Sequence, residues 1–156
     1  MDMRHALAIA CLAGTITACT RTPSSPEQVV RETVGRAAQA AEQRDLAALR
    51  EIVSAGYRDP QGYDRDGVLQ LARAVLLAHR SVHLVTRVKA VAFPASNQAT
   101  VSVITGMAGA RVAADRGAGG LAADLYRFEV NFAEEAPGAW RVTSAHWQPA
   151  ALAEAL

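Results

Sequence analysis

This sequence divides at one polar stretch, Tyr57-Arg58-Asp59-Pro60-Gln61-Gly62-Tyr63-Asp64-Arg65-Asp66-Gly67-Val68. Its Pro, Gly and Asp residues favour turns, so residues 57–63 are predicted to form a loop, and the acidic residues that follow are typical of a helix start. Apolar residues recur at helical spacing on both sides of the stretch, whereas after Arg80 they alternate with a period of two. The sequence therefore predicts helices first and strands second.

The first predicted helix has a clear start signal. Ser25 is placed to cap it, Pro26 occupies its first position, and Gln28 stands where a capping box carries Glu or Gln. Small and β-branched residues recur along one side, so an apolar stripe is expected to pack against a sheet as far as about Arg44.

Two further helices are expected around the polar stretch. One follows Asp45, with Gly56 as its expected stop. The other begins between residues 64 and 66 and is apolar over much of its circumference. A helix of that kind is usually covered on most sides, so the third helix is predicted to be mostly buried.

The rest of the chain predicts an antiparallel meander of four strands. The expected order is a strand at 81–93, a turn at 94–98, a strand at 100–107, a flexible Gly- and Ala-rich connection at 108–120, a strand with Tyr126, Phe128, Val130 and Phe132 on one face, a turn at 137–138 and a last strand at 140–148. In the second strand Val101, Val103, Thr105 and Met107 share one face, and Ser102 and Ile104 share the other.

The sequence does not decide which face of the last strand points inward. Alternation gives two sets of residues, and either of them suits the inside. The sets are Trp140, Val142, Ser144 and His146 on one side, and Arg141, Thr143, Ala145 and Trp147 on the other.

Four residues at these junctions carry a family resemblance. Tyr57 and Asp59 form an aromatic-x-Asp turn, Gly67 opens the third helix, and Trp147 closes the last strand. With the element order over residues 26–149, they resemble nuclear transport factor 2-like proteins, including the polyketide cyclase-like and ketosteroid isomerase-like branches. The resemblance implies an α+β fold in which N-terminal helices pack in a curved four-strand antiparallel sheet, a cone with a pocket that often dimerises through the sheet.

The start of the chain has the pattern of a bacterial lipoprotein signal. A short basic segment precedes an apolar run, and the run ends in Ile16-Thr17-Ala18-Cys19, which resembles a lipobox. Residues 1–18 are therefore predicted to be a signal peptide and Cys19 to be lipidated. The alternatives are an ordinary secretion signal and a membrane-spanning anchor, but the apolar run is too short to cross roughly 30 Å of hydrocarbon as a helix.

The remaining sequence predicts one anchored domain. Residues 19–25 form a lipidated tether, residues 26–150 the folded domain and residues 151–156 a C-terminal tail. Thr20 stands where an Asp would favour retention in the inner membrane. The expected location is therefore the bacterial cell envelope, at the outer membrane and facing the periplasm, with the membrane as a partner through lipid on Cys19 and a small molecule, an envelope protein or a second copy of the chain as the other.

Composition argues against several other classes of protein. The formal net charge is +1 and the arginines are scattered among acids, so nucleic acid is not expected as a partner. Cys11 leaves with the signal and Cys19 is used by lipid, so no disulfide is expected. His79 and His83 are four residues apart, but the helix is predicted to end between them, and no metal or cofactor is expected.

A catalytic set is incomplete in this sequence. Isomerases of the resembled family use a carboxylate base, and a Tyr with a protonated acid holds the oxyanion. The first predicted helix has no Tyr, and the strand at 100–107 has no carboxylate. Asp59 is the candidate base, although an Asp in a turn more often accepts hydrogen bonds from backbone N–H groups.

The sequence favours a non-catalytic binding module for a small ligand or a partner. The alternatives are an isomerase or cyclase-like enzyme that uses Asp59, assisted by His146 or Tyr57, and a structural homodimer that buries the aromatic strand face. Six residues are candidates to line a ligand pocket: Tyr57, Asp59, Tyr126, Phe128, His146 and Trp147.

Overall fold

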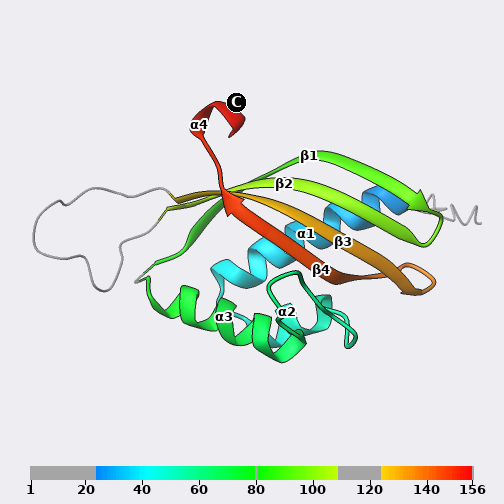
Figure 1. The fold of residues 1–156 in the computed structure, drawn as a ribbon, viewed down its shortest axis with the longest axis horizontal. Coiled ribbons are helices and arrows are strands. Elements are labelled where there is room, and N and C mark those ends of the chain that lie inside the picture. The colour runs from blue at the N-terminus through cyan, green and yellow to red at the C-terminus, as the bar shows by residue number, and fades with distance from the viewer. Residues whose placement is uncertain (1–23, 80, 109–123, 156) are drawn as a thin grey trace, which may run out of the picture.

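The computed structural model describes residues 24–79, 81–108 and 124–155 of the chain. A curved sheet covers a long helix and two shorter helices on one of its faces (Figure 1). The elements are α1 (Pro26–Glu42), α2 (Leu46–Ile52), α3 (Arg65–Leu77), β1 (His83–Ala95), β2 (Gln98–Ala108), β3 (Asp124–Ala136), β4 (Ala139–Pro149) and α4 (Leu152–Ala155). The predicted α+β class is confirmed. The predicted signal peptide, Cys19 and nearly all of the connection at 108–120 lie outside the described residues.

Each of the three main helices begins after a capping residue, and Ser25 is the cap that the sequence predicts. A side-chain oxygen accepts a hydrogen bond from a backbone N–H three residues later in every case. The pairs are Ser25 with Gln28 (3.2 Å), Asp45 with Ala48 (2.9 Å) and Asp64 with Gly67 (2.8 Å). The reciprocal half of the capping box is absent, because the Gln28 amide donates to Glu32 Oε1 at 2.9 Å instead of returning to Ser25.

The second helix ends earlier than the sequence predicts. Gly56 was the expected stop, but α2 ends at Ile52 and Val53 forms a bridge with Val142 of β4. The Ser54 N–H then donates to the Val142 carbonyl at 2.9 Å. Pairing with the edge of the sheet therefore competes with the last helical turn and ends it.

The sheet is an antiparallel meander in the order β1-β2-β3-β4. β2, β3 and β4 are longer than predicted, whereas β1 begins at His83, later than the predicted 81, and continues through Pro94 to Ala95. Proline is tolerated there because β1 is an edge strand, which leaves one side of its backbone free of ladder bonds. The β3–β4 turn contains Gly138 at φ 74°, a conformation that glycine adopts without strain.

The core lies between α1 and the face of the sheet that α1 covers, here called the inner face. Val30 of α1 and Val101 of β2 are fully buried, and Phe132 of β3 and Trp140 of β4 pack in the same cluster. Phe93 meets the Trp140 ring edge-on, with ring centroids 5.8 Å apart. The predicted faces of the second strand are confirmed, since Val101 lies on the inner face.

A bulge decides which residues of β4 face inward. Asn131 pairs with Ser144, but Phe132 pairs with Val142, so Thr143 is an extra residue in the register. Trp140 and Val142 share the inner face with the core before the bulge, and Ala145 and Trp147 share it after the bulge. Neither of the two sets expected from simple alternation lies wholly inside.

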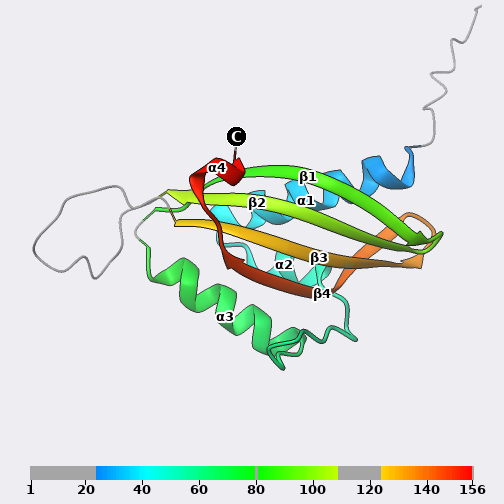
Figure 2. The ribbon, with the colours of Figure 1, turned by 45° about the horizontal axis from the view of Figure 1, so that its top comes forward.

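The prediction that the third helix is mostly buried is wrong for the part of the chain described. Leu69 and Leu76 are buried, but Val75 is 40% and Leu77 is 56% exposed. The reason is that α3 packs chiefly against α2 and stands away from the sheet (Figure 2). One side of α3, with Val68, Leu69 and Ala72, lines a cavity and is not part of a packed core.

The predicted C-terminal tail includes a single helical turn, α4. The Ala150 N–H donates to the Leu125 carbonyl at 2.9 Å, and Glu154 forms an ion pair with Arg127. This turn lies on the other face of the sheet, the outer face, away from α1, α2 and α3 (Figures 1 and 2).

Candidate functional site

The main candidate site is an apolar cavity between the inner face of the sheet and the three main helices. Its volume is about 290 Å³. Alanines of α1 and α3 leave room for it, because a helix that carries small side chains leaves space between its backbone and the sheet. The lining residues are Val34, Ala37, Ala38, Ala41, Leu49, Ile52, Val53, Tyr57, Val68, Leu69, Ala72, Leu84, Thr86, Val103, Thr105, Phe128, Val130, Phe132, Val142 and Ala145.

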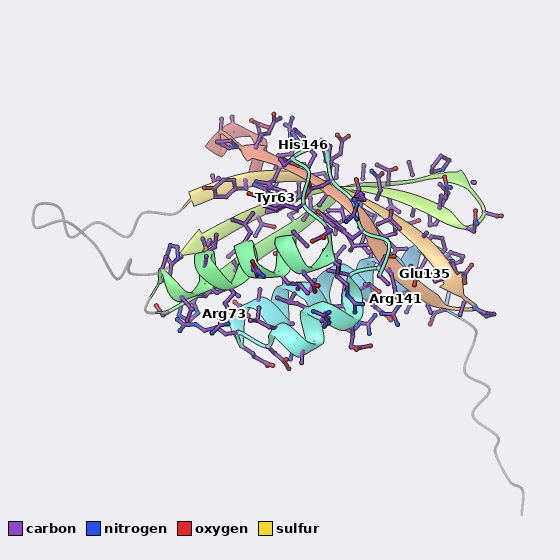
Figure 3. All side chains as sticks on the ribbon, turned by 60° about the horizontal axis from the view of Figure 1, so that its bottom comes forward. Tyr63, Arg73, Glu135, Arg141 and His146 are labelled. Atoms are coloured by element: carbon purple, nitrogen blue, oxygen red, sulfur yellow. The ribbon has the colours of Figure 1, made fainter. Side chains whose placement is uncertain are left out.

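The lining carries very few polar groups. Among the described residues that line the cavity, no side chain is acidic, basic or a histidine, and the polar ones are Tyr57, Thr86 and Thr105. Arg73 of α3 is exposed and lies outside the lining, on the side of α3 away from the sheet (Figure 3). The cavity is therefore suited to an uncharged, mainly apolar molecule.

Tyr57 and Asp59 form a buried pair in the cavity wall. Tyr57 is 1% exposed, and its hydroxyl donates to Asp59 Oδ2 at 2.9 Å. The other oxygen of this carboxylate, Oδ1, accepts the Tyr63 N–H at 2.9 Å. Burial raises the pKa of Tyr57, and the hydrogen bond to Asp59 and the charge of that carboxylate raise it further, so the phenol stays protonated.

This arrangement gives Asp59 a structural role in the loop. Both carboxylate oxygens are engaged, and the backbone closes the same turn through hydrogen bonds from the Gly62 N–H to the Asp59 carbonyl and from the Asp59 N–H to the Tyr63 carbonyl. Asp59 is buried behind Tyr57 and is not among the residues that line the cavity. A base must reach the proton it removes, and this geometry gives Asp59 no such reach into the cavity.

The loop is fixed to the edge of the sheet, which sets the position of Tyr57. The Arg58 N–H donates to the Thr143 carbonyl at 3.0 Å, and the Ala145 backbone hydrogen-bonds the Tyr57 hydroxyl. Together with the bridge at Val53, these bonds hold the loop against the middle of β4. Tyr57 is thus a rigid part of the cavity wall.

Aromatic side chains extend from the cavity along the inner face. Phe128 lines the cavity, and the rings of Trp147 and Tyr126 lie 6.3 and 6.4 Å from it by their centroids. Trp147 and Tyr126 are half-buried and are not among the lining residues. They lie at the end of the sheet where β3 starts and β4 finishes.

His146 belongs to a different site, a polar depression on the outer face of about 530 Å³. Asn131 lies in the middle of this depression, where it accepts from Thr100 Oγ1 at 2.9 Å and donates to Ser144 Oγ at 3.3 Å. The His146 Nδ1 lies 3.3 Å from the Gln61 amide nitrogen. The sheet separates His146 from the cavity that Tyr57 and Phe128 line.

The chain is similar to known proteins in structure but not in sequence. No model of a known protein family matches, and no curated protein matches in sequence. Solved structures match with high probability, among them a ketosteroid isomerase-like protein from Erwinia carotovora atroseptica, with a TM-score of 0.65 and 14% identity over 79% of this chain and 95% of that one. The chain has the nuclear transport factor 2-like fold.

Two further structures support this fold. A nuclear transport factor 2-like superfamily protein from Salmonella enterica serovar Typhimurium matches with a TM-score of 0.62 and 15% identity, over 80% of this chain and 91% of that one. A dehydratase candidate of the nuclear transport factor 2-like family from Streptomyces avermitilis matches with a TM-score of 0.65 and 17% identity, over 80% and 97%. Proteins described as ketosteroid isomerase-like and as a dehydratase candidate thus share the nuclear transport factor 2-like fold with this chain.

One cluster of hydrogen-bonded polar side chains in this domain could not be predicted from the sequence. Ser54 is buried and donates to Glu135 Oε1 at 2.5 Å, and Arg141 Nε lies 3.3 Å from Glu135 Oε2. Glu135 and Arg141 lie together near the β3–β4 turn, well apart from His146 and Tyr63 (Figure 3). Glu135 and Arg141 flank the β3–β4 turn, but Ser54 lies 81 residues before Glu135, so only the folded structure brings Ser54 to this pair.

The described residues contain neither a metal-binding cluster nor a membrane-spanning helix. Within residues 24–79, 81–108 and 124–155, no group of His, Cys, Asp and Glu side chains is placed to hold a metal ion. In the same ranges, no helix has both the length and the hydropathy that a membrane crossing requires.

Proposed function

We propose that this domain binds a small, mainly apolar molecule in the inner cavity and performs no chemistry on it. The observation that carries the proposal is the cavity lining, in which Tyr57 is the one titratable side chain among the described residues. Burial of apolar surface is the main source of affinity for such a ligand, at about 25 cal/mol per Å² removed from water.

The size of the cavity limits the ligand. Ligand pockets usually measure about 300–1,000 Å³, and a cavity of roughly 150 Å³ holds benzene. A cavity of about 290 Å³ therefore suits a molecule of one to three small rings, or a short branched chain.

The states of the candidate residues support the proposal that no chemistry takes place. The Tyr57 phenol is protonated and donates to Asp59, and the Asp59 carboxylate is occupied on both oxygens. His146 lies on the outer face. A proton transfer inside the cavity would need a base, and the described lining residues supply none.

The proposal is tested with N-phenyl-1-naphthylamine, an apolar dye whose fluorescence rises in a dry site. The wild-type domain is expected to bind it saturably. Ala72→Phe fills the cavity from α3 and is expected to weaken binding at least tenfold, whereas Ala74→Phe, on the exposed side of the same helix, leaves it unchanged. Equal binding by both variants, or no saturable binding at all, contradicts the proposal.

We also propose that Cys19 carries the lipid that holds the domain in the bacterial cell envelope, at the outer membrane and facing the periplasm. The lipobox-like Ile16-Thr17-Ala18-Cys19 and the polar tether after it support this. Two or more acyl chains are needed for stable anchoring, at about 0.8 kcal/mol per buried methylene.

The anchor is tested by expressing the full chain in a bacterium with two membranes. The purified protein is expected to start at an acylated Cys19, as read by mass spectrometry, and to fractionate with outer membranes. Cys19→Ser is expected to abolish both properties. A wild-type chain without acyl groups would contradict the proposed anchor.

A further inference from the structure

Three parts of the molecule meet at one end of the sheet. The start of α1, the β1–β2 turn and the β3–β4 turn lie together there, whereas the end of α3 and the short helix α4 lie toward the opposite end (Figures 1 and 2). The two turns are joined, because the Glu134 N–H donates to the Asn97 carbonyl at 2.9 Å. Residues 93–98 and 136–139 are here called the hairpin end.

The hairpin end is uncharged and largely exposed. All of residues 93–98 and 136–138 are exposed, and none of them is Asp, Glu, Lys or Arg. Phe93 is 39% exposed, although one side of its ring meets Trp140. Prolines and alanines make up much of the rest, at Pro94, Ala95, Ala136 and Pro137. A surface of this kind can lie against lipid headgroups without taking a charge out of water.

The acids beside the hairpin end already have partners within the protein. The pairs are Glu27 with Arg31 (2.8 Å), Glu134 Oε1 with the Gly138 N–H (2.7 Å), and Glu135 with the Ser54 hydroxyl and with Arg141. These contacts hold the carboxylates to neighbouring groups of the protein. The outermost surface at this end is therefore formed by the uncharged turns.

The broad surfaces of the domain carry exposed charges. The outer face of the sheet presents Arg127 and Glu129, and the exposed side of the helices presents Arg36, Glu42 and Arg73. Pressing a charged side chain out of water costs free energy. Either broad surface would therefore lie on an uncharged lipid surface at a higher cost than the hairpin end.

The proposed lipid is attached to the same end of the molecule. The helix α1 starts at Pro26, and six residue steps separate Cys19 from its N-cap Ser25. An extended chain covers at most about 3.6 Å per step, so this distance is at most about 22 Å. A strand of 13 residues, such as β1, is about 43 Å long at about 3.3 Å per residue. The tether thus keeps the start of α1 within about half a strand length of the lipid.

Building on the proposed anchor at Cys19, we propose that the hairpin end lies against the phospholipid surface and that the domain stands on the membrane with the end of α3 and α4 in water. The two turns supply a protein–lipid contact in addition to the acyl chains. The inner cavity reaches toward the opposite end, since Leu84 at the start of β1 and Ala41 near the end of α1 line it. The contact therefore holds that part of the cavity away from the membrane.

The test measures the distance of four sites from the membrane surface. The sequence has two cysteines, Cys11 and Cys19, and cleavage before Cys19 leaves the mature chain with no free thiol, so one added cysteine can be labelled alone. The acylated full chain is inserted into preformed phosphatidylcholine vesicles that carry a nitroxide quencher on some headgroups. A fluorescent label on Ser96→Cys or Ala136→Cys, at the hairpin end, is expected to lose more than half of its emission.

Two exposed positions toward the opposite end serve as matched controls. Ala78→Cys, after α3, and Ala153→Cys, on α4, are expected to keep their emission. Quenching at Ala153 as strong as at Ser96 would put the outer face on the membrane, and equally strong quenching at Ala78 would put the helices on it. Either result overturns the inference. So does the absence of quenching at all four sites.

A second measurement separates contact from mere closeness. The emission of an environment-sensitive label on Ser96→Cys is expected to shift to shorter wavelength when the chain binds vesicles without quencher. Ala136→Glu adds a charge to the neighbouring turn and is expected to reduce the shift, whereas Ala78→Glu is the control and is expected to leave it unchanged. An unshifted emission, or equal effects of the two added charges, overturns the inference.

The anchor is checked on the same samples, so that the two proposals fail in different ways. Acylation of Cys19 is read by mass spectrometry, and membrane attachment is read by flotation of the vesicles. An acylated chain that floats but shows equal quenching at the four sites overturns the proposed contact and leaves the anchor in place. A chain that carries no acyl group overturns both.

Discussion

The two faces of β2 differ in chemistry although they belong to the same eleven-residue strand. On the inner face Val101 and Val103 are buried against helices, and Thr105 lines an apolar cavity. On the outer face Thr100 joins Asn131 and Ser144 in a polar depression. The candidate residues therefore cannot act as one site, because the sheet separates those that line the apolar cavity from those on the solvent-exposed outer face.

The largest expected difference between the faces is in stability. Phe132, 2% exposed on the inner face, is expected to cost about 3–5 kcal/mol of unfolding free energy when changed to Ala, because the change opens a cavity in the core. The adjacent Asn131→Ala, on the outer face, is expected to cost less than about 1 kcal/mol. Urea unfolding of both variants measures the contrast, and similar losses would show that the outer face is also a core.

The second largest effect on stability is expected at the buried phenol of Tyr57. Tyr57→Phe removes the donor to buried Asp59 Oδ2 and is expected to cost about 1–3 kcal/mol. The pKa of this phenol is raised from its ordinary value of 10.0, so its proton stabilises the fold below that pH. Above about pH 10 the unfolded chain releases the proton and the folded chain keeps it, so stability falls by up to about 1.4 kcal/mol per pH unit.

The pH dependence of the unfolding free energy shows whether the Tyr57 phenol is kept protonated by burial or only makes a contact. Urea unfolding between pH 8 and 11 is expected to show the decline in the wild type and a shallower decline in Tyr57→Phe. Tyr63→Phe is the matched control, because Tyr63 is 37% exposed. Identical slopes for wild type and Tyr57→Phe would mean that the Tyr57 phenol titrates as freely as an exposed one.

A smaller effect is expected where the polar cluster meets the edge of the sheet. Ser54→Ala removes the hydroxyl that donates to Glu135 Oε1 and accepts the Gly56 N–H at 3.1 Å. The loss is expected to be about 1 kcal/mol, since Glu135 keeps Arg141 as a partner. Thermal unfolding measures it, with Ser144→Ala on the exposed outer face as the control. A larger loss of stability in Ser144→Ala than in Ser54→Ala would contradict this prediction.

The smallest effect is expected for His146. This side chain is exposed and touches Gln61 across the surface, so His146→Ala should change the unfolding free energy by less than about 0.5 kcal/mol. It should also leave dye binding in the inner cavity unchanged. A fall in dye affinity with His146→Ala would show that the two faces communicate.

Much of the fold could be predicted because its signals are local. Ser25, Asp45 and Asp64 mark helix starts through hydrogen bonds within a single turn. The strand alternation from Tyr126 to Phe132 likewise depends on neighbours in sequence. Patterns of this kind can be recognised in the sequence because all the residues that form them are close together along the chain.

The features that sequence could not give depend on partners far along the chain. The extra residue at Thr143 shifts which side of β4 faces inward, and only pairing with β3 reveals it. The exposure of Leu77 depends on where α3 packs, which its own apolar pattern cannot state. His146 was grouped with Tyr57 for the same reason, although the bulge puts it on the outer face.

The coverage of β4 by residues 53–58 also bears on the solubility of the protein. An unpaired strand edge is a template for pairing with another chain, which leads to aggregation. Val53, Ser54 and Arg58 bond the middle of the β4 edge at Val142 and Thr143, and β1 is the edge strand at the other side of the sheet. There Pro94 interrupts the row of donors and the register shift at Lys89 bends the strand. Many copies crowded together would therefore resist growing into a continuous sheet.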